Sequence, residues 1–393
     1  MDFSKVQAYL EQLVADGLPF AQLFVTKGRK TVFSYNVGWA DAAKTVPITD
    51  SHLCWCFSNT KVYTAVCLMR LVEEGKLSLD DPVSKYLPEF AETRCRKGDG
   101  IVKTDPPTLR HLISMTSGLT YDLGTKYTHF AEAFSRPGAT TREAVAALAQ
   151  EVLSFEPGTD YFYGWGHDVI AVVIEAATGM RFSDYVRRTI FEPLGIRDTG
   201  FHPDAEQRSQ FAQMYRYDGA ALAFRPIPTE NRYVFNGNYD SGGGGMFSCP
   251  KEYCKLLTAL ACGGTGPDGY RVLKPETIDQ MTVNQLCPKA LNSFRTKGIP
   301  GHRIPNKAGC GYALGVRTHM DPAASGRKTS IGEFGWTGAA GALSLVDRER
   351  ELAFCYTEQV MQHKKSPENP KSRSVYQDIH MPLINLICDA VDQ

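Results

Sequence analysis

The chain has 393 residues, enough to bury a large core in one big domain or in two to three smaller ones. Hydrophobic residues make up 43% and charged residues 22%, and 43 Lys and Arg balance 43 Asp and Glu. This balance argues against a protein that binds nucleic acid or an anionic membrane through its net charge. The opening residues, MDFSKVQAYL, show no basic stretch followed by an apolar run, so we expect no secretion signal. No apolar run is long enough to span a bilayer.

Helical spacing of apolar residues predicts a helix over residues 2–16, followed by two strands within 18–41 that are joined by a turn around Lys27-Gly28. From about residue 58 to 300, helical stretches such as TREAVAALAQEVL alternate with loops rich in Pro and Gly. Strand patterns return after residue 308, in GYALGVRTHM, KTSIGEFGW, GALSLVD and ELAFCYTE, and the last helix is predicted in YQDIHMPLINLICDAVDQ. The pattern indicates an α+β fold: an antiparallel sheet formed from both termini, flanked by helices, with a large, mostly helical inserted region. We expect residues 1–57 and 305–393 to form the sheet region and residues 58–304 the helical region.

Eleven cysteines are scattered along the chain, and none forms a Cys-x-x-Cys pair. A metal site or a thiol nucleophile would be a functional interpretation, but most of these cysteines lie in apolar context. Buried, reduced cysteines that pack as small hydrophobic residues explain the pattern better. With no expected secretion signal, this favours a cytoplasmic location.

One stretch, CWCFSNTKVYTAVCLMRLVEEGKL, places Ser58 and Lys61 three residues apart at the start of an apolar helical run. This spacing puts both side chains on one face of a helix. A serine hydroxyl needs a base to become a nucleophile, and a lysine can act as one if desolvation and nearby positive charge lower its pKa. The start of a helix also favours an anionic oxygen. Ser-x-x-Lys alone is a weak signal, because Ser is a common helix cap.

The blocks around this pair make the signal more specific. In order they are LSLDDPVSKYLPEF, TLRHLISMTSGL, FEPGTDYFYGWGHDVIAVVIE, FEPLGIRDTGF, GGGGMFSCPKEYCKLL and FGWTGAAGALSLVD. In order and spacing, over roughly residues 5–360, the chain resembles the serine β-lactamase-related family. That family holds class C β-lactamases, D-alanyl-D-alanine carboxypeptidases and family VIII esterases. The resemblance implies one catalytic domain with a β-lactamase/transpeptidase-like fold.

The resemblance also implies roles for individual residues. Ser58 matches the acylated nucleophile, Lys61 its partner, and Tyr163 the tyrosine that acts as general base and then as proton donor. The backbone N–H of Ala339 matches the group that completes an oxyanion hole with that of Ser58. A phenol beside an ammonium has its anion favoured, so we expect the pKa of Tyr163 to fall.

A second set of positions implies contacts with the substrate. Trp336-Thr337-Gly338 matches a strand motif that the family usually writes Lys-Thr-Gly or His-Thr-Gly, and Trp165 stands where the family commonly has Asn. Aromatic surfaces therefore replace two polar groups, a change that esterases of the family tolerate and that disfavours β-lactams and peptides. Arg317, His319 or Arg327 could supply a substitute cation.

A glycine run and three histidines do not indicate further functional sites. The run of glycines at 242–245 lacks the Gly-Lys-Ser/Thr of a phosphate-binding loop and indicates a tight backbone path before a helix near Pro250. His111, His129 and His167 have no metal-ligand spacing, so we expect no metal and no cofactor.

The sequence therefore predicts a serine hydrolase that works through an acyl-enzyme, with small neutral esters as the favoured substrates. Its partner would be a small-molecule ester or amide, with no nucleic acid and no membrane, and the oligomeric state is open. The alternatives are β-lactamase or D-alanyl peptidase activity, an acyltransferase that uses the same site, and a non-catalytic ligand-binding member of the family.

Overall fold

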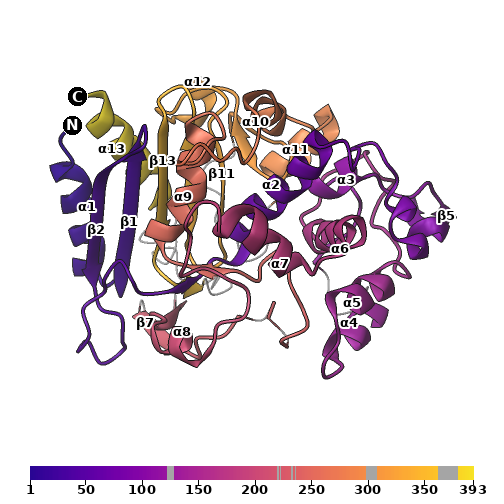
Figure 1. Ribbon diagram of the computed structural model, residues 1–393, viewed down its shortest axis with the longest axis horizontal. Coiled ribbons are helices and arrows are strands. Elements are labelled where there is room, and N and C mark those ends of the chain that lie inside the picture. The colour runs from indigo at the N-terminus through magenta and orange to yellow at the C-terminus, as the bar shows by residue number, and fades with distance from the viewer. Residues whose placement is uncertain are drawn as a thin grey trace.

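The computed structural model describes residues 1–121, 128–218, 221, 223–231, 233–234, 236–297, 308–361 and 379–393. Within these residues, a seven-stranded antiparallel sheet combines strands from both ends of the chain (Figure 1). The pairing of β1 with β13 joins the two sets, with Leu23 opposite Tyr356 and Val25 opposite Phe354. In sheet order the strands are β2 (Lys30–Gly38), β1 (Phe20–Lys27), β13 (Leu352–Thr357), β12 (Leu343–Asp347), β11 (Phe334–Thr337), β10 (Arg317–His319) and β9 (Cys310–Tyr312).

Helices cover both faces of this sheet. Because side chains alternate along a strand, Leu23 and Val25 of β1 pack with the terminal helices α1 (Ser4–Ala15) and α13 (His380–Asp392). Thr26 points to the opposite face, where its hydroxyl lies 2.8 Å from that of Thr258 on α9 (Pro250–Ala261). Figure 1 shows the two chain ends close together, beside α1 and α13. The sheet is thus the middle layer of three.

The remaining helices follow β2 and lie mostly beside the sheet (Figure 1). The central one is α2 (Thr60–Glu73), which buries 11 of its 14 residues and so connects the sheet to the helical region. The others are α3 (Leu109–Ile113), α4 (Thr128–Ser135), α5 (Thr141–Leu148), α6 (Gly166–Thr178), α7 (Phe182–Val186), α8 (Ala205–Ser209), α10 (Pro275–Thr282), α11 (Pro288–Thr296) and α12 (Pro322–Ser325). Small sheets are formed by β14 (Val360–Met361) with β6 (Met214–Asp218) and β7 (Ala223–Ile227), by β3 (Cys54–Trp55) with β8 (Phe247–Ser248), and by β4 (Arg94–Lys97) with β5 (Gly100–Lys103).

The predicted α+β fold with a sheet built from both termini is confirmed, but two strand predictions were too long. GYALGVRTHM forms two short strands, because Gly315 turns the chain with a φ of +82° and the Ala313 N–H donates to the Val316 carbonyl at 2.8 Å. In KTSIGEFGW only the end joins β11, since a turn closed by the Glu333 N–H and the Ser330 carbonyl precedes it.

Some sequence predictions lie outside the described residues. These are the boundary between residues 304 and 305 and the start of the last helix before residue 379. The division into a sheet region and a helical region that form one catalytic domain therefore stays a proposal. In the described part of the chain, no helix combines the length and apolarity needed to cross a membrane. All eleven cysteines are described, all are free thiols, and most are buried, as their apolar context predicts.

Candidate active site

Ser58 lies in a single 3-10 turn, η1 (Phe57–Asn59), immediately before α2. Its side chain is buried, and the residue before it, Phe57, has a φ of +45°. Positive φ is costly for a bulky side chain, about 1–3 kcal/mol, and is held only where the surroundings fix it. Here the pairing of Trp55 with Phe247 and the bond from the Cys56 N–H to the Met246 carbonyl fix the approach to the turn.

Lys61 faces Ser58 from the first turn of α2, as the spacing predicts. Its Nζ atom lies 3.3 Å from Ser58 Oγ, 3.0 Å from Tyr121 Oη and 2.5 Å from the carbonyl oxygen of Gly243. The side chain is fully buried. Burial lowers the pKa of Lys61 to about 7, although the charge of Asp168 acts in the opposite direction. The lysine can therefore be a neutral amine at neutral pH.

Tyr163 stands between Lys61 and the strand motif. Its ring centroid is 4.6 Å from Lys61 Nζ, and its hydroxyl shares a hydrogen bond with Ser58 and accepts one from Trp336 Nε1 at 3.0 Å. The expected fall in the pKa of Tyr163 was wrong. Burial raises this pKa well above its ordinary value, and the bonds from Ser58 and Trp336 offset burial only in part. At neutral pH the phenol keeps its proton.

The strand motif reaches this cluster from β11. Trp336 stacks on Tyr163, with ring centroids 5.6 Å apart, and Thr337 Oγ1 has no hydrogen-bond partner among the described residues. A side chain at Gly338 would place a Cβ atom 2.4 Å from the Cys56 carbonyl, so only glycine lets the strand end pack this closely to η1. The N–H of Ala339, which follows, donates to no backbone or side-chain acceptor that the structure describes.

Trp165 is placed differently from Trp336. It is fully buried at the start of α6, with ring centroids 4.6 Å from Tyr121, 4.7 Å from Phe130 and 5.9 Å from Tyr233. Trp165 therefore supports Tyr121, whose hydroxyl meets Lys61. Direct contact between Trp165 and a substrate stays a prediction.

Sequence reasoning missed Tyr121 and Asp168. Asp168 is fully buried on α6 and accepts hydrogen bonds from Ser241 Oγ at 2.7 Å and Tyr239 Oη at 3.3 Å. Burial raises the pKa of Asp168, and its interaction with Lys61 opposes that rise. A carboxylate inside the apolar run GHDVIAVVIE is a signal that could have identified it, since Asp is rarely buried without a partner. No local pattern distinguishes Tyr121.

The glycine run at 242–245 serves this network. A Cβ atom on Gly243 would lie 2.4 Å from Asp168 Oδ2 and 2.9 Å from Tyr121 Oη. Glycine therefore lets the backbone carbonyl approach Lys61, which fits the predicted tight backbone path.

The proposed substitute cations are engaged elsewhere. Arg317 is buried and makes two hydrogen bonds to Glu333, at 2.5 and 3.0 Å, and Arg327 lies 3.4 Å from the same carboxylate. His319 is buried against Ser325, and burial lowers its pKa. None of the three replaces the cation that the family carries at the position of Trp336.

The three histidines considered from the sequence, His111, His129 and His167, lie in different environments. Thr108 caps α3, and its backbone N–H donates to His111 Nδ1 at 3.3 Å. His129 is exposed near Glu151. His167 is buried, and burial together with the charge of Lys61 holds its pKa well below its ordinary value. Within the described residues, no three His, Cys, Asp or Glu side chains cluster as metal ligands would.

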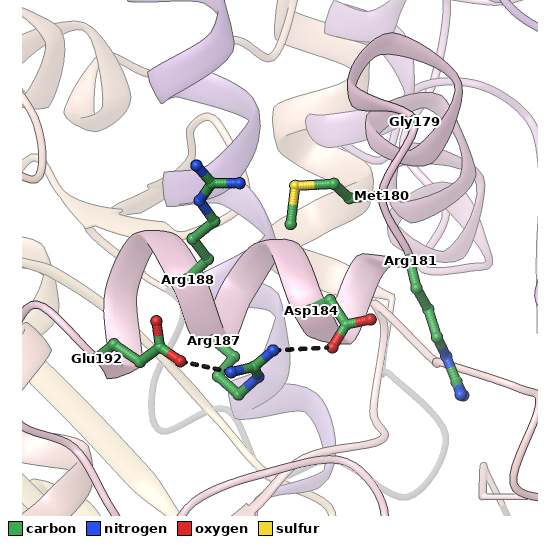
Figure 2. Close-up of a pocket in the computed structure, with 7 residues that line it drawn as sticks. All are labelled: Gly179, Met180, Arg181, Asp184, Arg187, Arg188 and Glu192. Atoms are coloured by element: carbon green, nitrogen blue, oxygen red, sulfur yellow. Dashed lines mark hydrogen bonds and ion pairs between the residues drawn. The ribbon is translucent and has the colours of Figure 1, made fainter.

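Another pocket, of about 500 Å³, lies at the end of α6 and along α7 and contains none of the residues named above (Figure 2). Figure 2 shows Arg187 between Asp184 and Glu192, with both ion pairs drawn. Arg181 binds Asp240. Most of the charged side chains that line this pocket are therefore paired within the protein, and the pocket is a poor candidate for a second site.

Comparison with known proteins identifies the family of this chain. The family described as Beta-lactamase matches residues 6–376, nearly the whole chain. The protein belongs to the β-lactamase family. A relative in this family, Esterase EstB of Burkholderia gladioli, is 32% identical over an alignment of 340 residues that covers 80% of this chain and 79% of that one. Protein Rv1367c of Mycobacterium tuberculosis is 27% identical over 91% of this chain and 90% of its own.

Solved structures agree on the fold. The structure titled "EstCE1, a hydrolase with promiscuous acyltransferase activity" has a TM-score of 0.79 at 23% identity, over 99% of this chain and 98% of that one. Membership of the β-lactamase family, together with these relatives, identifies the chain as a serine hydrolase, which confirms the family predicted from the motifs.

Replacing Asp168 with asparagine tests its coupling to Lys61. Because the Asp168 charge raises the pKa of Lys61, removing it should lower that pKa further and move the acidic limb of the pH–rate profile to lower pH. Ester hydrolysis measured across the pH range reports this shift. Ser241→Ala is the control, because it removes a hydrogen bond to Asp168 but keeps the charge. An unchanged limb in Asp168→Asn would mean that Asp168 is uncharged in the active enzyme.

Proposed function

We propose that the protein is a serine esterase that forms an acyl-enzyme on Ser58. The observation that carries the proposal is the 3.3 Å distance from Ser58 Oγ to a buried lysine with a pKa of about 7. A lysine in this state can accept a proton at neutral pH, whereas an ordinary lysine cannot. The relative Esterase EstB, at 32% identity, supports an ester as the substrate.

In the first step, Lys61 is the general base. A neutral amine has two N–H donors and one lone pair, and three oxygen atoms surround Lys61 Nζ. The carbonyl of Gly243 and the hydroxyl of Tyr121 can take the two N–H groups. The lone pair is then left for the Ser58 proton, and the Ser58 oxygen attacks the ester carbonyl.

Tyr163 is the general acid for the leaving group. It holds its proton at neutral pH and is hydrogen-bonded to Ser58, so the phenol can protonate the leaving alkoxide while Lys61 keeps the serine proton. The Tyr163 phenolate formed in this way regains a proton from the lysine ammonium or from the water that attacks the acyl-enzyme. The backbone N–H groups of Ser58 and Ala339 would hold the oxyanion in both steps.

The groups near the reacting carbonyl favour an uncharged substrate there. Trp336 replaces the family's cation, and its indole N–H is already bonded to Tyr163. Thr337 Oγ1 is available to bind a substrate oxygen. We therefore propose small esters, or amides of similar size, with no charge beside the scissile bond. The free thiols also support a proposed cytoplasmic location.

The pKa of Lys61 sets an expected pH profile. The base must be deprotonated, so kcat/KM for an uncharged ester should fall about tenfold per unit below about pH 7 and level off above it. Spectrophotometric assays of p-nitrophenyl acetate between about pH 5.5 and 8.5 measure this limb directly. A profile that stays flat across that range would contradict Lys61 as the base.

Acyl-enzyme formation itself has a kinetic test. If deacylation is the slower step, rapid mixing with p-nitrophenyl acetate should release about one equivalent of p-nitrophenol per active site before the steady rate. If acylation is slower, adding methanol or hydroxylamine should divert the acetyl group to the added nucleophile. A protein that shows neither a burst nor a diverted product would not be an acyl-enzyme esterase.

A further inference from the structure

A groove of about 640 Å³ opens beside the candidate active site. Its lining residues come from β3 and η1, from the small sheet β14-β6-β7, from α8 and from the segment after β7. The volume lies within the roughly 300–1,000 Å³ of typical small-molecule sites. Apolar side chains provide much of the surface: Trp55, Phe57, Met214, Ile227, Val234 and Met361.

The groove adjoins segments that carry or position the reacting groups. Phe57 lines it and is the residue immediately before Ser58. Asn231, which also lines it, donates a hydrogen bond from Nδ2 to the carbonyl of Gly244 at 2.7 Å. The neighbouring carbonyl, that of Gly243, accepts from Lys61. A substrate whose carbonyl meets Ser58 could therefore extend into this groove.

Charge in the groove is unbalanced. Arg208 on α8 and Arg216 on β6 are exposed lining residues, and neither forms an ion pair with any residue that the structure describes. By contrast Arg225, on the adjacent strand β7, is paired with Asp218 at 2.8 Å. Glu230 is the acidic residue among those that line the groove. Two arginines against one carboxylate leave the described lining positively charged.

We propose that this groove binds the non-reacting part of the ester, and that Arg208 and Arg216 receive an anionic group at its far end. The substrate class is an amphipathic ester with an uncharged reacting carbonyl, an apolar body and a terminal carboxylate. The exposed arginines contrast with the buried Phe57 beside Ser58, which places the carboxylate at the solvent end of the groove and the apolar body against the aromatic wall. This inference rests on the proposed esterase function and narrows its substrate.

Two matched substrate pairs test the inference, because the carboxylate could be carried on either side of the ester. On the acyl side, mono-4-nitrophenyl adipate is compared with 4-nitrophenyl hexanoate. On the alcohol side, the acetate ester of 4-(4-hydroxyphenyl)butanoate is compared with 4-butylphenyl acetate. In at least one pair, kcat/KM should favour the carboxylated ester, and Arg208→Glu and Arg216→Glu should each lower that preference, together by about tenfold. Added salt should reduce the preference as well.

Arg188→Glu is the matched control, because Arg188 is an exposed arginine of the separate pocket in Figure 2 and the substitution changes net charge equally. It should leave the preference unchanged. Equal kcat/KM within both pairs, or a preference that survives both groove substitutions, would overturn the inference while the esterase proposal stands. Failure of the wild-type protein to hydrolyse any of the four esters would instead overturn the proposed function, and the inference with it.

Discussion

Ser58→Ala is expected to abolish turnover of p-nitrophenyl acetate and butyrate, because it removes the hydroxyl that lies 3.3 Å from Lys61 Nζ, the proposed base. Lys61→Ala and Tyr163→Phe should each lower kcat by about a hundredfold or more, the scale of lost acid–base catalysis. For Lys61 the loss removes the proposed proton acceptor, 3.3 Å from Ser58 Oγ. For Tyr163 it removes the proposed proton donor to the leaving group. Steady-state assays of the three purified variants measure these effects.

A neighbouring tyrosine provides the control for Tyr163→Phe. Tyr161 is also buried, but its hydroxyl has no hydrogen-bond partner in the described part of the chain, so Tyr161→Phe removes an oxygen without breaking the network. It should keep nearly full activity. Equal losses in the two variants would show that packing, rather than proton transfer, explains the effect. Full activity of Ser58→Ala would end the acyl-enzyme proposal.

A short neutral ester should exceed nitrocefin in kcat/KM by a wide margin. A β-lactam needs its carboxylate held while the amide is attacked, and this chain has Trp336 where the family has a cation. A charge-assisted hydrogen bond contributes roughly 1.5–3 kcal/mol, so its loss costs about tenfold to a hundredfold in transition-state binding. Arg317 and Arg327 cannot compensate while they remain buried with Glu333. Aromatic side chains instead favour an apolar acyl or alkyl group.

Both substrates should be assayed on one preparation. Ser58→Ala is included to show that the same nucleophile acts on each. The inferred groove does not change this expectation, because the nitrocefin carboxylate is close to the reacting carbonyl, whereas we place the carboxylate site at Arg208 and Arg216, which are exposed. A kcat/KM for nitrocefin equal to or above that for the ester would favour the β-lactamase alternative.

The fold and the first contacts of the site could be predicted from local patterns. The strands at both ends and the Ser-x-x-Lys spacing are properties of short segments, and the spacing does bring Lys61 to Ser58. The hairpin at Gly315 was missed, because the four residues between its strands, 313–316, are mostly apolar and are hard to distinguish from a continuous strand.

What could not be predicted depends on contacts between distant segments. Tyr121 meets Lys61 across 60 positions, and Gly243 does so across 182. The expected pKa of Tyr163 failed for the same reason: it was based on one neighbouring charge, whereas complete burial by residues far along the chain has the larger effect. Burial of this kind also lowers the pKa of Lys61 to about 7, which makes this lysine a candidate base.

Covalent labelling asks directly whether Ser58 is an activated nucleophile. The wild-type protein is treated with a fluorophosphonate, digested and analysed by mass spectrometry, with Ser58→Ala and Lys61→Ala treated in parallel. We expect one phosphonylated residue, Ser58, with no label in Ser58→Ala and slower labelling in Lys61→Ala. An unlabelled Ser58 in folded wild-type protein, or label on a different residue that persists in Ser58→Ala, would contradict this role of Ser58.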